Sequence, residues 1–215
     1  MKKVKKSQAM TKIPRIVFTG GPCAGKTTTI NYVGKKLKEL GFHCVLPAEV
    51  SAILIDAALL PNKIRPLRYG PFERAYVKTQ LFWESIFDKM AQEAEGDKKI
   101  IIFDRGVIDL AAYMPVPEFN AIIKKHGWNF EELRDSYDLV VHMVTAAEGA
   151  EKFYNLDMPA RYAGLEEARW NEKNLRAIWQ GHPNIRIIEN PASFEQKMKH
   201  AFEAVCSFLK LAYPS

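Results

Sequence analysis

One short segment of the sequence carries residue types suited to binding phosphate. Residues 20–29 read GGPCAGKTTT, so Gly20 and Gly25 frame four residues and are followed by Lys26 and Thr27. This spacing matches the phosphate-binding loop pattern G-x-x-x-x-G-K-[ST]. Glycines allow successive backbone N–H groups to point at phosphate oxygens without interference from a Cβ atom. The lysine supplies positive charge to the β- and γ-phosphates, and the Thr27 hydroxyl is a candidate Mg²⁺ ligand.

The other residues of this segment are small, as a loop wrapped around phosphate requires. The candidate nucleotide-binding residues are Gly20, Gly21, Cys23, Ala24, Gly25, Lys26, Thr27 and Thr28. Cys23 is one of three widely spaced cysteines, a pattern that indicates neither a metal site nor a disulfide framework. We expect Cys23 to be a small residue that the turn tolerates rather than a redox sensor. A purely structural glycine turn would leave the lysine and threonines after Gly25 unexplained.

A second set of charged residues follows an apolar run later in the sequence. Residues 100–103 read IIIF and lead directly into Asp104 and Arg105. A carboxylate at the carboxyl end of a buried parallel strand lies at the edge of the sheet where ligands bind. We therefore expect Asp104 to join Thr27 as a Mg²⁺ ligand. The alternative is that Asp104 caps the helix that follows.

Regular elements must position these groups, and apolar patterns predict such elements along the chain. The phosphate loop lies between a predicted strand, 13–19, and a predicted helix, 26–40. Further strands are predicted at 42–47, 99–104, 138–145 and 184–190, further helices at 51–60, 72–95, 146–154, 166–180 and 194–213, and loops at 61–71, 113–120 and 156–165. This alternation indicates an α/β fold in three layers, a five-stranded parallel sheet with helices on both faces.

Charge and composition limit the classes of protein to consider. The 215 residues carry a formal net charge of +6, much of it near the N-terminus. We expect residues 1–12 to form a disordered basic tail and residues 13–215 to form a single domain. The tail could attract nucleic acid or anionic lipid, but we expect it to remain solvated. No apolar run approaches the roughly 20 residues of a membrane span, and the start lacks the apolar core of a signal peptide, so we expect a cytoplasmic protein.

Five segments, in the same order, resemble one known family. They are TGGPCAGKTT (19–28), DRGVIDLAAY (104–113), HMVTAAEGAEKFY (142–154), ARYAGLEEAR (160–169) and GHPNIRIIEN (181–190). Together they resemble the AAA-domain P-loop ATPases, which are related to the ribosylnicotinamide kinase domain of bifunctional NAD-biosynthesis proteins. The resemblance implies a P-loop NTPase fold similar to that of nucleoside and nucleotide kinases.

The resemblance also implies roles for particular residues. Asp104 and Arg105 would help to bind phosphates and substrate. A lid around 156–169 would bring Arg161 over the transferred phosphoryl group, where it would stabilise developing charge. Arg169 and Arg176 could do the same, or they could pair with Glu166, Glu167 or Glu172 along a solvated helix. Asn190 would lie in the short loop against the edge of the adenine ring.

The position of the catalytic base is open in the sequence. The family usually places a Pro-Glu pair just after the second strand, whereas this chain has Pro47, Ala48 and Glu49. Glu49 could still reach the site, or it could serve as an acid in the first turn of the next helix. Asp104 and Asp109 are the alternatives.

These observations lead to two function hypotheses. The first is an ATP-binding, kinase-like enzyme that transfers the γ-phosphate of MgATP to a nucleoside-like acceptor or hydrolyses it. By analogy with kinases, the acceptor pocket would be formed by the 61–71 loop and the 72–95 helix, through Phe72, Arg74, Tyr76, Gln80 and Trp83. The second is a nucleotide-gated protein, switched by ATP or GTP, with a basic surface for a lipid or protein partner. A ring-forming motor ATPase is disfavoured because the residues after the phosphate loop are needed to complete a single sheet and form no additional subdomain.

Overall fold

The fold is built on one sheet of five parallel strands. The computed structural model describes residues 12–54, 71–154 and 164–212. The strands are β1 (Arg15–Thr19), β2 (His43–Val45), β3 (Lys99–Asp104), β4 (Leu139–Met143) and β5 (Ile185–Ile188). They are ordered β2-β3-β1-β4-β5, and every neighbouring pair is parallel. The predicted five-stranded parallel sheet is therefore confirmed, and the phosphate loop begins at the carboxyl end of its central strand.

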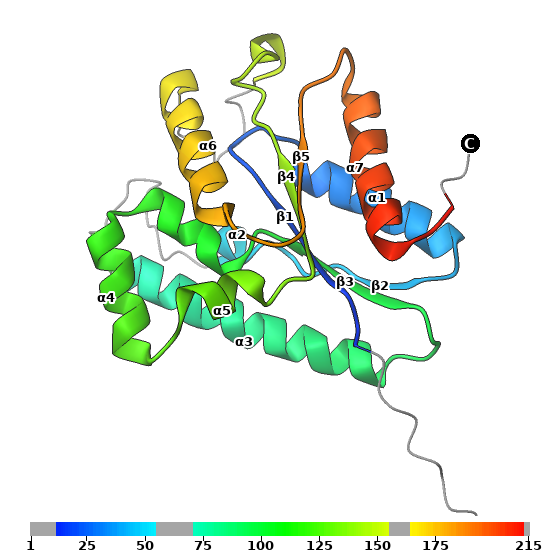
Figure 1. The fold of residues 1–215 in the computed structure, drawn as a ribbon, viewed down its shortest axis with the longest axis horizontal. Coiled ribbons are helices and arrows are strands. Elements are labelled where there is room, and N and C mark those ends of the chain that lie inside the picture. Colours follow the sequence, from blue (N-terminus) through cyan, green and yellow to red (C-terminus); the bar gives the residue numbers. More distant parts are fainter. Residues whose placement is uncertain (1–11, 55–70, 155–163, 213–215) are drawn as a thin grey trace, which may run out of the picture.

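Helices cover both faces of this sheet. They are α1 (Lys26–Glu39), α2 (Val50–Leu54), α3 (Pro71–Glu93), η3 (Val107–Tyr113), α4 (Val116–His126), α5 (Phe130–Asp135), η4 (Glu151–Phe153), α6 (Leu165–Trp179) and α7 (Phe194–Leu209), where η marks a 3₁₀ helix. Figure 1 shows α1 and α7 side by side on one face, with α3, α4 and α5 on the other.

The alternation of side chains along β1 explains the two cores. Val17 points into the cluster that contains residues of α3, η3 and α4, whereas Ile16 and Phe18 point into the cluster formed with α1 and α7. Successive strand residues face opposite sides of a sheet. Because both sides are apolar, the central strand is buried on both faces, as a parallel sheet between two helical layers requires.

Two predicted segments differ from the structure. Residues 146–154 do not form the predicted helix but a series of turns followed by the short η4. Gly149 adopts a left-handed φ of 78° there, which interrupts a right-handed helix. The predicted 113–120 loop is also wrong, because α4 begins at Val116. Pro115 is the N-cap of α4 and Pro117 lies in its first turn, where a missing N–H costs no hydrogen bond.

Some predictions fall on parts of the chain outside the described residues. These are nearly all of the basic tail, residues 55–60 of the predicted 51–60 helix, the 61–70 part of the predicted loop, and residues 156–163 of the predicted lid, including Arg161. They stay predictions. Among the helices of the described ranges, none is both long enough and apolar enough to cross a membrane.

Candidate nucleotide-binding site

The phosphate loop connects β1 to α1 through two glycines with unusual backbone conformations. Gly20 has a φ of 130°, and a Cβ atom at this position would lie 1.9 Å from the carbonyl oxygen of Met143. Gly25 has a φ of 83° and is the N-cap of α1, with no side-chain cap hydrogen bond. The first N–H groups of a helix have no partners within it, so they remain available to an anion in the loop.

Lys26 crosses the interior of the loop. Its Nζ donates hydrogen bonds to the carbonyl oxygens of Gly20, at 2.9 Å, and Gly21, at 3.1 Å. Burial, followed by the nearby positive charge of Arg105, lowers the pKa of Lys26 to about 8. A phosphate group would be a stronger partner for this buried ammonium than two neutral carbonyls.

Thr27 and Asp104, the two residues predicted to bind Mg²⁺, contact each other. The Thr27 hydroxyl donates to Oδ2 of Asp104 at 2.5 Å. Oδ1 of Asp104 is buried and has no hydrogen-bond partner among the described residues. Burial, and then the charge of Glu49, raises the pKa of Asp104. The alternative role for Asp104, as a helix cap, is not observed, because Gly106 is the N-cap of η3 and no side chain caps it.

This pair of oxygen-bearing side chains fits Mg²⁺. The ion is usually held in nucleotide sites by one or two protein ligands, with phosphates and water completing its shell. Within the described ranges, no group of three or more histidine, cysteine, aspartate or glutamate side chains could hold a metal ion. The unpaired Oδ1 of Asp104 is a buried oxygen that a cation would satisfy.

Arg105 links the end of β3 to a cluster of acidic and phenolic groups. Its backbone has a left-handed φ of 71°, and its N–H donates to the Phe18 carbonyl at 2.9 Å. Its Nε donates to Oε1 of Glu49 at 2.6 Å, and its Nη1 donates to the Tyr113 hydroxyl at 3.0 Å. The sharp turn therefore directs the guanidinium toward Glu49.

Glu49 joins the site despite its shifted position in the sequence. It lies directly before α2 and accepts hydrogen bonds from the Ser51 hydroxyl and from Arg105. Burial acts to raise its pKa, but the charges of Arg105 and Lys26 outweigh that effect and lower it. Glu49 is therefore a carboxylate at neutral pH, close enough to Lys26 for their charges to interact.

Asp109 is less suited to act as a base. It is buried, and both carboxylate oxygens accept from the Thr19 hydroxyl, at 2.8 and 2.9 Å, while Oδ1 also accepts from Nε1 of Trp179 at 2.6 Å. Burial raises the pKa of this carboxyl. These bonds join β1, η3 and α6, so Asp109 holds elements together beneath the site.

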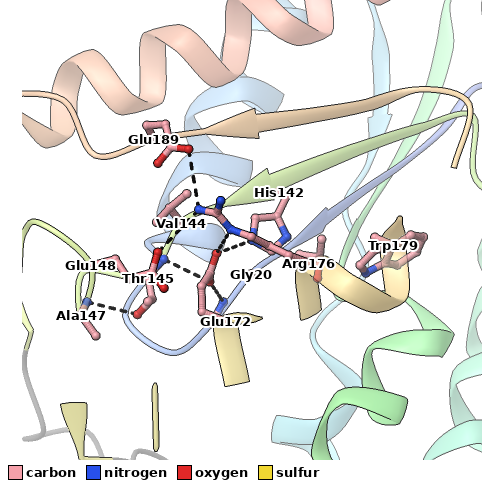
Figure 2. A network of polar contacts seen from close by, with 12 residues as sticks. Gly20, His142, Val144, Thr145, Ala147, Glu148, Glu172, Arg176, Trp179 and Glu189 are labelled. Atoms are coloured by element: carbon pink, nitrogen blue, oxygen red, sulfur yellow. Dashed lines mark hydrogen bonds and ion pairs between the residues drawn. The ribbon is translucent and has the colours of Figure 1, made fainter. Parts of the chain in front are cut away.

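A carboxylate on α6 reaches the phosphate loop from a distant part of the sequence. Glu172 is completely buried and accepts hydrogen bonds from the backbone N–H of Gly21, at 2.9 Å, and of Thr145, at 3.3 Å. His142 lies 2.5 Å from its other oxygen, and Nε of Arg176 donates to that oxygen at 3.1 Å. Figure 2 shows Glu172 and Arg176 together near the ends of β1, β4 and β5.

These contacts define the electrostatic state of Glu172. Burial alone would raise its pKa, but the hydrogen bond and charge of His142, with the Gly21 N–H and Arg176, lower the pKa to about 2. From the sequence, Glu172 is expected only as a pairing partner of an arginine on a solvated helix. The pairing with Arg176 is confirmed, but the helix face is buried against the loop, which the charged sequence of α6 does not indicate.

The other predicted residues occupy the following positions. Arg169 donates to the Ala147 carbonyl at 2.8 Å and pairs with Glu151 at 3.2 Å, so it holds η4 against α6. In the loop, Cys23 has a left-handed φ of 56°, Ala24 is buried and Thr28 is exposed. On α3, Gln80 is buried and donates to Glu84 at 2.8 Å.

Comparison with known families agrees with this arrangement. A family model described as an AAA domain matches residues 15–197. The match begins at the first residue of β1 and includes the phosphate loop, all five strands and α6. No curated protein matches the chain at a significant level.

Proposed function

Since this chain belongs to the AAA-domain family and has its P-loop NTPase fold, we propose that it is a kinase-like enzyme that uses MgATP. It would transfer the γ-phosphate to a hydroxyl group of a nucleoside-like acceptor, or to water. One observation carries the proposal: Lys26, the Thr27–Asp104 pair and the Glu49–Arg105 pair converge where β1 and β3 end.

The phosphate-binding roles follow from charge and contact. Lys26 would exchange its two carbonyl partners for oxygens of the β- and γ-phosphates. Thr27 and Asp104 would hold Mg²⁺, which when bound neutralises charge on the transferring phosphoryl group. Arg161, which the family resemblance places in the lid, would close over that group.

Glu49 is the residue best suited to accept the proton of the acceptor hydroxyl. It is ionised at neutral pH because Arg105 and Lys26 lower its pKa against the effect of burial. Asp104 accepts from Thr27 and would hold the metal, and both oxygens of Asp109 are occupied by internal hydrogen bonds. Arg105 would orient the Glu49 carboxylate through its bond at 2.6 Å.

The experiment measures ATP binding by calorimetry and turnover with a panel of acceptors. The panel contains nucleosides, nucleotides and nicotinamide riboside, the last because the family that the sequence resembles is related to ribosylnicotinamide kinase domains. We expect Lys26→Ala to abolish binding and turnover. We expect Glu49→Gln to keep binding within about threefold but to lower turnover by about 10²–10⁴, the usual contribution of a general base.

Matched controls separate these effects from a general loss of charge. Lys35→Ala removes a lysine from the exposed side of the same helix as Lys26, and Glu93→Gln neutralises an exposed glutamate at the end of α3. Neither should change binding or turnover. If the chain binds ATP but transfers phosphate to no acceptor and not to water, the proposal that it is an enzyme would be contradicted and the nucleotide-gated alternative favoured. Unchanged ATP binding in Lys26→Ala would contradict both.

A further inference from the structure

An aromatic side chain lies directly against the phosphate loop. Phe194 is the first residue of α7, and its ring covers the position of the missing side chain at Gly25. A Cβ atom on Gly25 would lie 2.3 Å from Cε2 and 2.6 Å from Cζ of this ring. The edge of the ring therefore touches the last glycine before Lys26.

The remainder of this ring faces solvent. Phe194 is 40% exposed, and it belongs to neither of the two apolar clusters among the described residues. A phenylalanine gains most from burial of both faces of its ring. A half-exposed ring beside a phosphate-binding loop is therefore suited to cover an apolar group of the ligand that the loop holds.

Asn190 and Lys197 tie the turn before Phe194 to the segment that follows β4. The Asn190 amide donates to the carbonyl oxygens of Thr145, at 2.8 Å, and Glu148, at 2.7 Å. Its Oδ1 accepts from Nζ of Lys197 at 2.7 Å, and that ammonium also donates to the Val144 carbonyl at 2.5 Å. Both polar atoms of Asn190 are therefore occupied within the protein.

This bonding pattern shifts the expected base contact from Asn190 to Phe194. Both N–H donors of this amide are used, and its oxygen already accepts from an ammonium, so the side chain is poorly suited to read the edge of a base. Asn190 instead fixes the turn between β5 and α7, and Ser193, the N-cap of α7, accepts from the Gln196 N–H at 3.2 Å. The ring at the start of α7 is thus pre-positioned at the mouth of the loop.

We propose that Phe194 stacks on the nucleobase of the nucleotide whose phosphates occupy the loop. This inference rests on the proposed binding of nucleotide at Gly20–Thr28. The phosphates would lie on the N-terminal turn of α1, and the base would pass over Gly25 to cover the exposed part of the ring. Every nucleobase has an apolar π-face, so stacking of this kind supplies affinity without selecting one base. The site should therefore accept ATP and GTP with similar affinity.

The test compares ATP with inorganic tripolyphosphate, both with Mg²⁺, by calorimetry on the full chain. Phe194→Leu keeps an apolar side chain over Gly25 but removes the aromatic face. We expect this variant to bind ATP and GTP about tenfold more weakly, within the range for one stacked base. Tripolyphosphate, which has no base, should bind equally well to both proteins. Phe194→Tyr should bind ATP like the wild type.

The controls make each outcome decisive. Phe82→Leu makes the same substitution at a ring that is 64% exposed on α3, and it should change nothing. An equal loss of ATP and tripolyphosphate affinity in Phe194→Leu would overturn the inference, because the ring would then only support the loop. Unchanged ATP affinity would overturn it too, while leaving the proposed function intact. A wild-type chain that binds neither ligand would overturn both.

Discussion

At the scale of single residues, Lys26 should make nucleotide binding depend on pH. Burial beside Arg105 makes the charged form of Lys26 less favourable, which is why its pKa falls to about 8. A bound triphosphate favours the charged form, so binding should require the proton on Nζ. The affinity for nucleotide should therefore be highest well below pH 8 and should fall as the pH rises through 8.

We expect ATP affinity to fall about tenfold between roughly pH 7.5 and pH 9, because the protonated fraction of Lys26 falls by that factor. Calorimetry over this range, repeated in buffers of different ionisation enthalpy, would also show proton uptake on binding above pH 8. In Lys26→Arg the charge persists throughout, so its affinity, whatever its absolute value, should not change with pH. An equal decline in both proteins would assign the effect to another group.

Individual residues also show which parts of the candidate site can be predicted from the sequence. The phosphate loop was recognisable because its function depends on residues that are adjacent in the chain. Glu49 appeared displaced by one position, yet the short segment before α2 still brings it to Arg105. Asn190 was expected to contact the nucleotide, and its amide proved to be bonded within the protein, because hydrogen-bond partners from a neighbouring strand end cannot be read from a sequence.

At the scale of elements, α6 contacts the phosphate loop directly. Glu172 accepts from the Gly21 N–H and pairs with Arg176 one turn further along the helix. If the negative charge of this buried carboxylate is removed, the positive charge of Arg176 and the N–H group of Gly21 lose their ionised partner. The docking of this helix and the shape of the loop should therefore fail together.

We expect Glu172→Gln to lower the free energy of unfolding by about 3 kcal/mol at neutral pH, measured by urea denaturation. Glu166→Gln, on the same helix but with a completely exposed side chain, should change it by less than about 0.5 kcal/mol. The pKa of Glu172 is lower in the folded chain, about 2, than in the unfolded chain. The contribution of the Glu172 charge to the free energy of unfolding is thus complete above pH 4.5 and lost as the pH falls toward 2. The difference in this free energy between wild type and Glu172→Gln should therefore narrow over that range.

A constant difference in the free energy of unfolding between wild type and Glu172→Gln down to pH 2 would show that packing, not charge, holds α6 in place.

Helices and strands can be predicted from the sequence where residues close together in the chain determine them. The strands follow continuous apolar runs and were found correctly. The 146–154 segment was not, because Gly149 and the bonds from Asn190 to the Thr145 and Glu148 carbonyls favour turns over the helix its composition suggests.

At the scale of the whole molecule, the site gathers residues from both ends of the chain. The loop follows β1, the proposed metal ligand Asp104 ends β3, and the base-stacking ring that we propose begins α7. A nucleotide bound there would touch the carboxyl ends of two strands together with α1 and α7, which are far apart in the sequence. It should therefore stabilise the complete fold rather than one segment of it.

We expect MgATP at about 100 times its dissociation constant to add about 2.7 kcal/mol to the free energy of unfolding. For a domain of this size that corresponds to an increase of about 5–10 °C in Tm, which differential scanning fluorimetry would measure. Lys35→Ala should show the same increase and Lys26→Ala none. A wild-type Tm that does not respond to MgATP would contradict nucleotide binding by the native chain.

The bond between Glu172 and the Gly21 N–H also bears on how the protein is made. The two residues are 151 positions apart, so the ribosome completes the phosphate loop long before it produces the carboxylate that holds it. A nascent chain that ends before α6 contains the whole nucleotide-binding motif but lacks the group that shapes it. Capture on immobilised ATP would then distinguish finished molecules from unfinished ones, although both carry the same motif.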